Sequence, residues 1–131
     1  MPERATSSGQ KQDIFKSYKM KRENKQVVKY NKLVRDKIPQ IIEKNGQGAI
    51  IEIASKKEYE EKLKEKLLEE VKEFLKEGSK EEFADILEVI HAIGKYKQFN
   101  RKEIEFIRKK KLEERGGFQK RIILKETVKG E

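Results

Sequence analysis

The sequence contains no cysteine and no long hydrophobic run. Without cysteine, the chain can form neither a disulfide nor a thiolate metal site, and this composition favours a cytoplasmic protein. No apolar stretch approaches the length of a membrane span, and no signal-peptide core follows Met1, so we expect no membrane partner. A glycine-rich phosphate loop is also missing, which argues against a P-loop NTPase.

Hydrophobic residues are scarce as well, at 34% of 131 residues against 44% charged. This length suits one domain with a modest core, and the composition favours a helical protein that buries further surface by self-association. The net charge of +9 raises the possibility of a nucleic-acid partner. However, residues 1–29 alone carry eight basic and three acidic residues, so more than half of the excess lies outside the expected fold.

The composition predicts three regions. Residues 1–29 are polar and poorly periodic, and we interpret them as a basic flexible tail, with an arm that contacts a partner as the alternative. Residues 30–126 hold the periodic segments and form the predicted domain. Residues 127–131 are a predicted frayed C-terminus.

Capping signals predict the helices. A first helix should begin near Pro39 and end at Asn45-Gly46. Ser-x-x-Glu capping boxes predict helices from about 56 to 77 and 80 to 99, and Asn100 starts a last one that ends near Arg115. We therefore predict an all-α protein with short extended segments near 49–54 and 118–124, either strands that pair or plain connectors.

The most informative stretch, residues 69–85, reads EEVKEFLKEGSKEEFAD. Glu70 falls inside the apolar stripe of its predicted helix, and Glu82 falls inside the stripe of the next one. Glu73 and Asp85 lie at the same-handed edge of each stripe. Two such helices folded back on each other would gather four carboxylates, which repel unless cations neutralise them. Mg²⁺ suits this set because it prefers oxygen ligands.

Other interpretations of these residues remain open. Glu82 could serve only as the acid of its capping box, while Glu70 and Glu73 could pair with lysines of a neighbouring helix. Lys32 and Arg35, just before the first helix, are either a solvated entry segment or a cationic clamp for phosphate. The single histidine, His91, falls away from the apolar stripe and is interpreted as a surface or interface residue rather than a base or a metal ligand.

The acidic block resembles the E-x-x-E and E-x-x-D signature of the all-α nucleoside triphosphate pyrophosphohydrolases, which include the MazG-like and phosphoribosyl-ATP pyrophosphohydrolase families. It reads EVKE at 70–73 and EFAD at 82–85. The segments YNKLVRDKIPQII and ERGGFQKRI are closer still to a branch described as predicted house-cleaning, noncanonical NTP pyrophosphatases. The resemblance covers about residues 30–126. The gap between Glu73 and Glu82 is shorter than in many MazG-like proteins, so the substrate of MazG is not carried over.

The resemblance implies a MazG-like helical bundle completed by oligomerisation, as a homodimer or a higher homo-oligomer. It implies that a nucleotide is cleaved between its α- and β-phosphates, giving a monophosphate and pyrophosphate. Mg²⁺, with Mn²⁺ as an alternative, would be bound by Glu70, Glu73, Glu82 and Asp85. Glu70 and Glu73 would be catalytic, and the phosphate contacts would be Lys32, Arg35 and Arg115.

Three other functions stay open at this point. One is phosphoribosyl-ATP hydrolysis in histidine biosynthesis, which uses the same chemistry on another substrate. Another is a nucleic-acid-binding module that uses the basic tail and Lys109–Lys111, although this leaves Glu70 unexplained. The third is a structural adaptor whose acidic residues only make ion pairs between helices.

Overall fold

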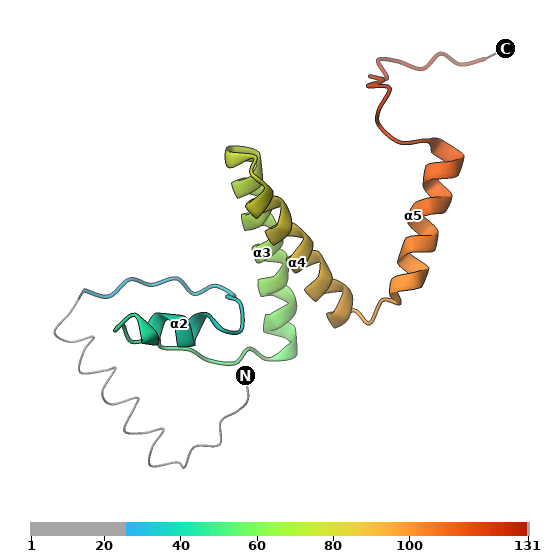
Figure 1. The fold of residues 1–131 in the computed structure, drawn as a ribbon. Coiled ribbons are helices and arrows are strands. Elements are labelled where there is room, and N and C mark those ends of the chain that lie inside the picture. The colour runs from blue at the N-terminus through green and yellow to red at the C-terminus, as the bar shows by residue number, and fades with distance from the viewer. Residues whose placement is uncertain (1–25, 131) are drawn as a thin grey trace. The chain divides into compact units, whose positions relative to one another are not determined.

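The computed structural model describes residues 26–130, which form four α-helices and no strand (Figure 1). The helices are α2 (Ile38–Lys44), α3 (Lys56–Glu77), α4 (Lys80–Tyr96) and α5 (Arg101–Arg115). The all-α class expected from the sequence is therefore confirmed for the described residues. Most of the predicted tail, up to residue 25, lies outside them.

The helices begin and end close to the residues that the sequence marks. Pro39 lies in the first turn of α2. Ser55 Oγ accepts a hydrogen bond from the Glu58 amide at 3.2 Å and so caps α3, which ends at Gly78 in a left-handed conformation. Asn100 Oδ1 accepts a hydrogen bond from the Glu103 amide at 3.0 Å and caps α5 in the same way.

The end of α4 differs from the prediction, because the helix ends at Tyr96 rather than near residue 99. Gln98 adopts a positive φ of 60°, and the Phe99 amide donates to the Gly94 carbonyl at 2.9 Å. This is the hydrogen bond of a Schellman-type stop, which glycine usually provides. Because Gln98 is an uncommon residue at such a position, the composition of this segment gave no sign of the stop.

Neither predicted extended segment forms a strand within the described chain. Residues 49–54 run as an irregular connector into α3, where Ile51 is 58% and Ile53 89% exposed. Residues 118–124 contain a turn followed by irregular chain, and Phe118 is 95% exposed. The connector interpretation therefore holds for residues 49–54, since the strand alternative required a paired neighbour.

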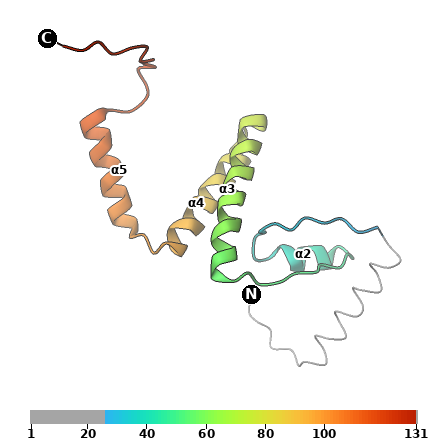
Figure 2. The same cartoon turned by 180° about the vertical axis from the view of Figure 1, so that it is seen from behind.

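The chain divides into two units, Met1–Ile90 and His91–Glu131. In the first unit, α3 and α4 lie side by side and antiparallel, joined at Gly78-Ser79 (Figures 1 and 2). Leu63 of α3 is 2% exposed and Val89 of α4 is 7% exposed, and they are the buried hydrophobic residues among those described. Phe74 and Phe83 pack at a ring-centroid distance of 5.7 Å. The core of this unit is the seam of the α3–α4 hairpin.

The described part of the second unit contains the end of α4, all of α5 and the segment after it. Every residue from 101 to 130 is exposed. Arg101 donates to His91 Nε2 at 2.8 Å, so that nitrogen of the imidazole acts as the acceptor. None of the helices among residues 26–130 is long and apolar enough to cross a bilayer.

We predict that Leu63→Ala lowers the free energy of unfolding by about 2–4 kcal/mol, because it leaves a cavity in the hairpin seam. Urea denaturation followed by circular dichroism measures this loss. Leu124→Ala is the matched control, since Leu124 is 76% exposed and its truncation should cost less than about 0.5 kcal/mol. Equal losses in the two variants would show that the seam is not the core.

Candidate functional site

Two segments far apart in the sequence meet at the polar side of the α3–α4 hairpin. Residues 26–37, here called the leading segment, precede α2 and supply Lys32 and Arg35. Lys32 Nζ contacts Glu69 of α3 at 2.5 Å, and Arg35 contacts Asp85 of α4 at 2.8 Å. The two predicted phosphate-binding cations of this segment therefore lie against acidic residues of both helices.

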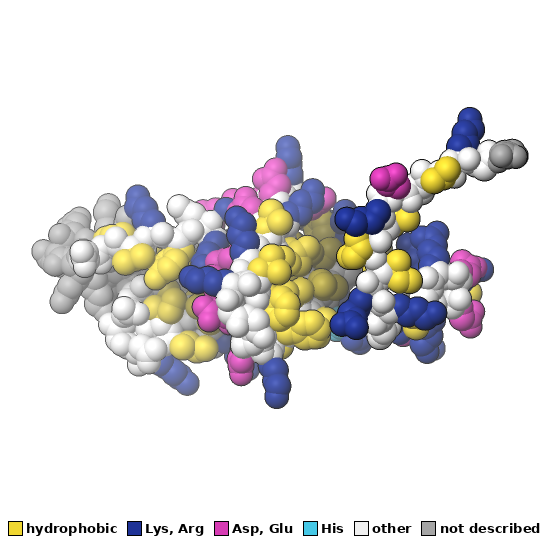
Figure 3. All heavy atoms as spheres, turned by 90° about the horizontal axis from the view of Figure 1, so that it is seen from above, with side chains coloured by type: hydrophobic (Ala, Val, Ile, Leu, Met, Phe, Trp, Pro, Cys, Tyr) yellow, Lys and Arg dark blue, Asp and Glu magenta, His cyan; other side chains and the backbone are white. Residues whose placement is uncertain are grey.

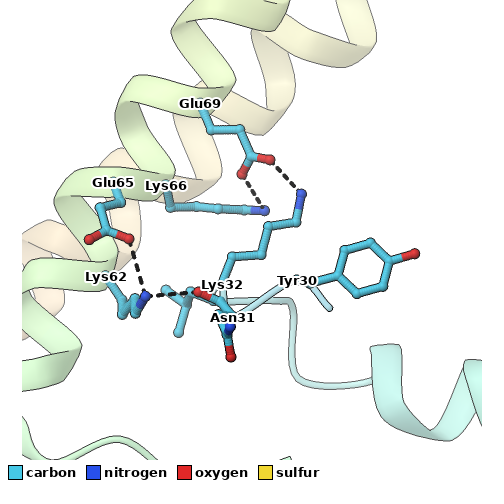
Figure 4. A pocket seen from close by; sticks show the side chains of 8 residues that line it. Tyr30, Asn31, Lys32, Lys62, Glu65, Lys66 and Glu69 are labelled. Carbon is cyan, nitrogen blue, oxygen red and sulfur yellow. Dashed lines mark hydrogen bonds and ion pairs between the residues drawn. The ribbon is translucent and has the colours of Figure 1, made fainter. Parts of the chain in front are cut away.

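Lysines of α3 complete this group. Lys66 Nζ lies 3.1 Å from Glu69 and 3.5 Å from Glu70, so it bridges two neighbouring carboxylates. Lys62 Nζ donates to the Asn31 carbonyl at 2.8 Å and holds the leading segment on the helix. Figure 4 shows the three lysine amines converging around Asn31 and Glu69.

These contacts surround a hollow of about 300 Å³. It is lined by side chains of the leading segment and of one face of α3: Tyr30, Asn31, Lys32, Leu33, Lys62, Glu65, Lys66 and Glu69 (Figure 4). The Lys32 amine also lies 5.9 Å from the centre of the Tyr30 ring, within the range of a cation–π contact. The hollow therefore combines three lysine amines with an exposed aromatic ring.

The electrostatics follow from this geometry. The pKa of Lys32 is raised, chiefly by its hydrogen bond to Glu69 and further by attraction to Glu69, Glu70 and Glu73. The pKa of Glu69 is lowered, chiefly by the hydrogen bond from Lys32 and also by Lys66. The charged forms of both partners are thus favoured, as expected for a hydrogen-bonded ion pair.

The four predicted metal ligands have different surroundings. Glu70 has 13% of its side chain accessible and lies beside Lys66, and Glu73 is exposed. Glu82 accepts hydrogen bonds from the Ser79 amide at 3.2 Å and from the Ser79 hydroxyl, which makes it the acid of a capping box. Asp85 is held by Arg35.

Within residues 26–130, no three acidic or histidine side chains are grouped closely enough to hold a metal ion. The donor set itself suits Mg²⁺, because all four ligands are carboxylates. The four carboxylates do not converge on one point, because Glu70, Glu82 and Asp85 each contact a different partner within the chain. Of the alternative roles that the sequence left open, capping by Glu82 is observed, whereas Glu70 pairs with Lys66 of its own helix rather than with a lysine of a neighbouring helix.

Arg115, the third predicted phosphate contact, is the exposed last residue of α5 in the second unit. Its assignment stays a prediction. The sequence interpretation passed over Lys62, Lys66 and Glu69, because it searched only the apolar stripe for misplaced charge. Their spacing contained the signal, since positions 62, 66, 69 and 73 follow one side of a helix.

Comparison with known proteins identifies no relative: the chain matches no protein-family model, no curated protein and no solved structure.

We predict that Lys32→Met lowers the free energy of unfolding by about 0.5 kcal/mol at neutral pH, a small value because the pair is partly exposed. Since the pKa of Glu69 is lowered in the fold, this contribution is present above its ordinary value of 4.5 and is lost as pH falls through the folded value. On the alkaline side it persists past 10.5 and is lost as pH rises through the raised pKa of Lys32.

The measurement is urea denaturation of wild type and variant at pH 7 and pH 3. Lys72→Met, at an exposed position of α3, controls for the loss of one positive charge. The difference between wild type and Lys32→Met should be smaller at pH 3 than at pH 7. An undiminished difference at pH 3 would mean that Lys32 stabilises the fold through packing of its methylenes rather than through Glu69.

Proposed function

We propose that this protein is a Mg²⁺-dependent nucleotide pyrophosphohydrolase that cleaves a modified nucleoside triphosphate between its α- and β-phosphates. One observation carries the proposal: Lys32 and Arg35 lie against the acidic side of the α3–α4 hairpin. A site for this reaction needs carboxylates for metal and cations for phosphate next to each other, and here both sets come from remote parts of the chain. The motif resemblance described above supports the same assignment.

In this proposal Glu70, Glu73, Glu82 and Asp85 hold Mg²⁺, which supplies charge neutralisation on the phosphate oxygens. Lys32 and Arg35 exchange their carboxylate partners for phosphate oxygens when substrate binds, because both partners are anionic oxygens. Arg115 adds a further phosphate contact. Glu73, which is exposed, accepts the proton of the attacking water. Glu70 is held in position by its largely buried surroundings and by its ion pair with Lys66.

Self-association is part of the proposal, as a homodimer or a higher homo-oligomer. Large apolar side chains of both hairpin helices remain about half exposed or more in the single chain: Leu68, Leu75, Phe83, Leu87 and Ile90. Such a concentration of apolar surface on two adjacent helices is typical of an interface.

We predict that Glu70→Gln reduces Mg²⁺-dependent pyrophosphate release at least about 100-fold while the helical circular dichroism signal is unchanged, because a neutral amide binds a hard cation poorly. The assay is pyrophosphate release over a panel of standard and modified nucleoside triphosphates and phosphoribosyl-ATP, with Mg²⁺ or Mn²⁺. Turnover restricted to phosphoribosyl-ATP would assign the protein to histidine biosynthesis instead.

The matched control is Glu61→Gln, an exposed acidic residue on the same helix, which should leave turnover within about twofold of wild type. No pyrophosphate from any substrate of the panel, or full activity in Glu70→Gln, would overturn the proposal.

A separate prediction concerns the metal alone. Calorimetric titration of the metal-free protein with Mg²⁺ should show a stoichiometric site that is lost in Asp85→Asn, because a surface network of ion pairs has no fixed number of cation sites. The structural-adaptor hypothesis predicts no saturable heat in either protein.

A further inference from the structure

The two sides of the α3–α4 hairpin have opposite character. Acidic residues follow the same-handed edge of the apolar stripe on both helices, and in an antiparallel pair these edges lie on one side. The leading segment contacts that side through Glu69 and Asp85. The exposed apolar residues follow the other edge, and Figure 3 shows hydrophobic side chains gathered beside the end of the hairpin.

On α4 the apolar edge is a straight row. Phe83, Leu87 and Ile90 are 54%, 53% and 49% exposed. Gly94 continues the row, because the spacing of 83, 87, 90 and 94 follows one line along a helix. A row of three large side chains thus ends at a residue with none.

Gly94 has no explanation within the described chain. Its φ is not positive, so its backbone does not require glycine, and a Cβ built on it meets nothing within 4 Å. Glycine inside a helix is less stable than alanine. A glycine at such a position is expected where another element approaches the helix closely.

We infer that this element is α4 of a second copy, packed antiparallel about a two-fold axis between Glu88 and Val89. In that register Phe83 lies opposite the partner's Gly94, and Leu87 lies opposite the partner's Ile90. The largest side chain of the row then fills the space left by the residue that lacks one. Because the axis is two-fold, the fit occurs twice in each dimer.

The charges of α4 fit the same register. Its first half carries Glu81, Glu82, Asp85 and Glu88 against one lysine, Lys80, whereas its last turn carries Lys95. Antiparallel pairing places the mainly acidic first half of one α4 beside the last turn of its partner, which carries Lys95, and it also opposes the two helix dipoles. A parallel pair would instead place like charges together. The complementarity lies within one helix, which is why a second copy suits this face better than an unrelated protein.

This inference rests on the self-association included in the proposed function and not on its nucleotide chemistry. Because the chain lacks cysteine, single cysteines can test it directly. Phe83→Cys and Gly94→Cys chains, mixed and oxidised, should form an interchain disulfide, whereas neither chain should do so alone. The register brings positions 83 and 94 together, while two copies of position 83 lie about 16 Å apart along the helix axis. Disulfides within either single-variant sample would overturn the register.

The second arm of the experiment measures the dimer dissociation constant by analytical ultracentrifugation. Gly94→Leu should weaken the dimer at least about tenfold, because it fills the space for the partner's Phe83. Ala84→Leu adds the same side chain type on the same helix but off the row, and should weaken it less than about threefold. The double variant Phe83→Ala/Gly94→Leu should dimerise more tightly than Gly94→Leu alone, because the smaller side chain at position 83 of one chain makes room for the leucine side chain added at position 94 of the other.

Circular dichroism identifies any variant that fails to fold, and Gly94→Ala then replaces Gly94→Leu, because alanine favours the helix. A wild-type chain that stays monomeric at all concentrations, as when another segment of the same chain covers the row, would overturn the inference. So would unchanged dimerisation of the folded Gly94 variant. Dimerisation in this register without any nucleotide turnover would refute the proposed function and leave the inference standing.

Discussion

The antiparallel packing of α3 on α4 is the constraint on which the other features depend. Gly78, in a left-handed conformation, and Ser79, which caps the start of α4, reverse the chain within two residues. The seam between the helices is closed by Leu63, Val89 and the Phe74–Phe83 ring pair. Because the helices are antiparallel and closely joined, equivalent edges of their apolar stripes share one side. A hairpin built this way has one polar and one apolar side without any further element. The leading segment contacts the polar side, and the exposed row on α4 lies on the apolar side.

On the polar side, the chain neutralises its own carboxylates. Lys66 bridges Glu69 and Glu70, and the leading segment adds Lys32 and Arg35. Each such pair contributes about 1 kcal/mol or less, because its members stay partly exposed. Pairs this weak hold the leading segment in place yet exchange partners readily. In the proposed function, a substrate that brings phosphates and metal would offer both members of each pair a replacement partner.

The sequence predicted the helices well because their ends are set by local chemistry. Ser55, Asn100 and the two glycines after α3 and α5 each act on backbone groups a few residues away. Residues 49–54 could not be decided, because an extended segment rich in isoleucine becomes a strand only beside another strand. The pairing of Lys32 with Glu69 spans 37 positions and depends on the path of the leading segment, which no local pattern encodes.

Glu82 belongs to the capping box of α4, and this role is compatible with its proposed role as a metal ligand. Its carboxylate accepts from the Ser79 amide and hydroxyl, while Ser79 Oγ lies 3.5 Å from the Glu82 amide. The loss of such a cap costs about 1 kcal/mol, and part of it persists if only the carboxylate turns away, since Ser79 still caps the helix. In the proposed function, a divalent cation would offer the Glu82 carboxylate a charged partner in place of this cap. The cap therefore orients the Glu82 carboxylate at the start of α4, and the loss of this contact costs little stability. In the proposed function, the ion pairs that Glu70 makes with Lys66 and Asp85 makes with Arg35 would be replaced in the same way by a divalent cation.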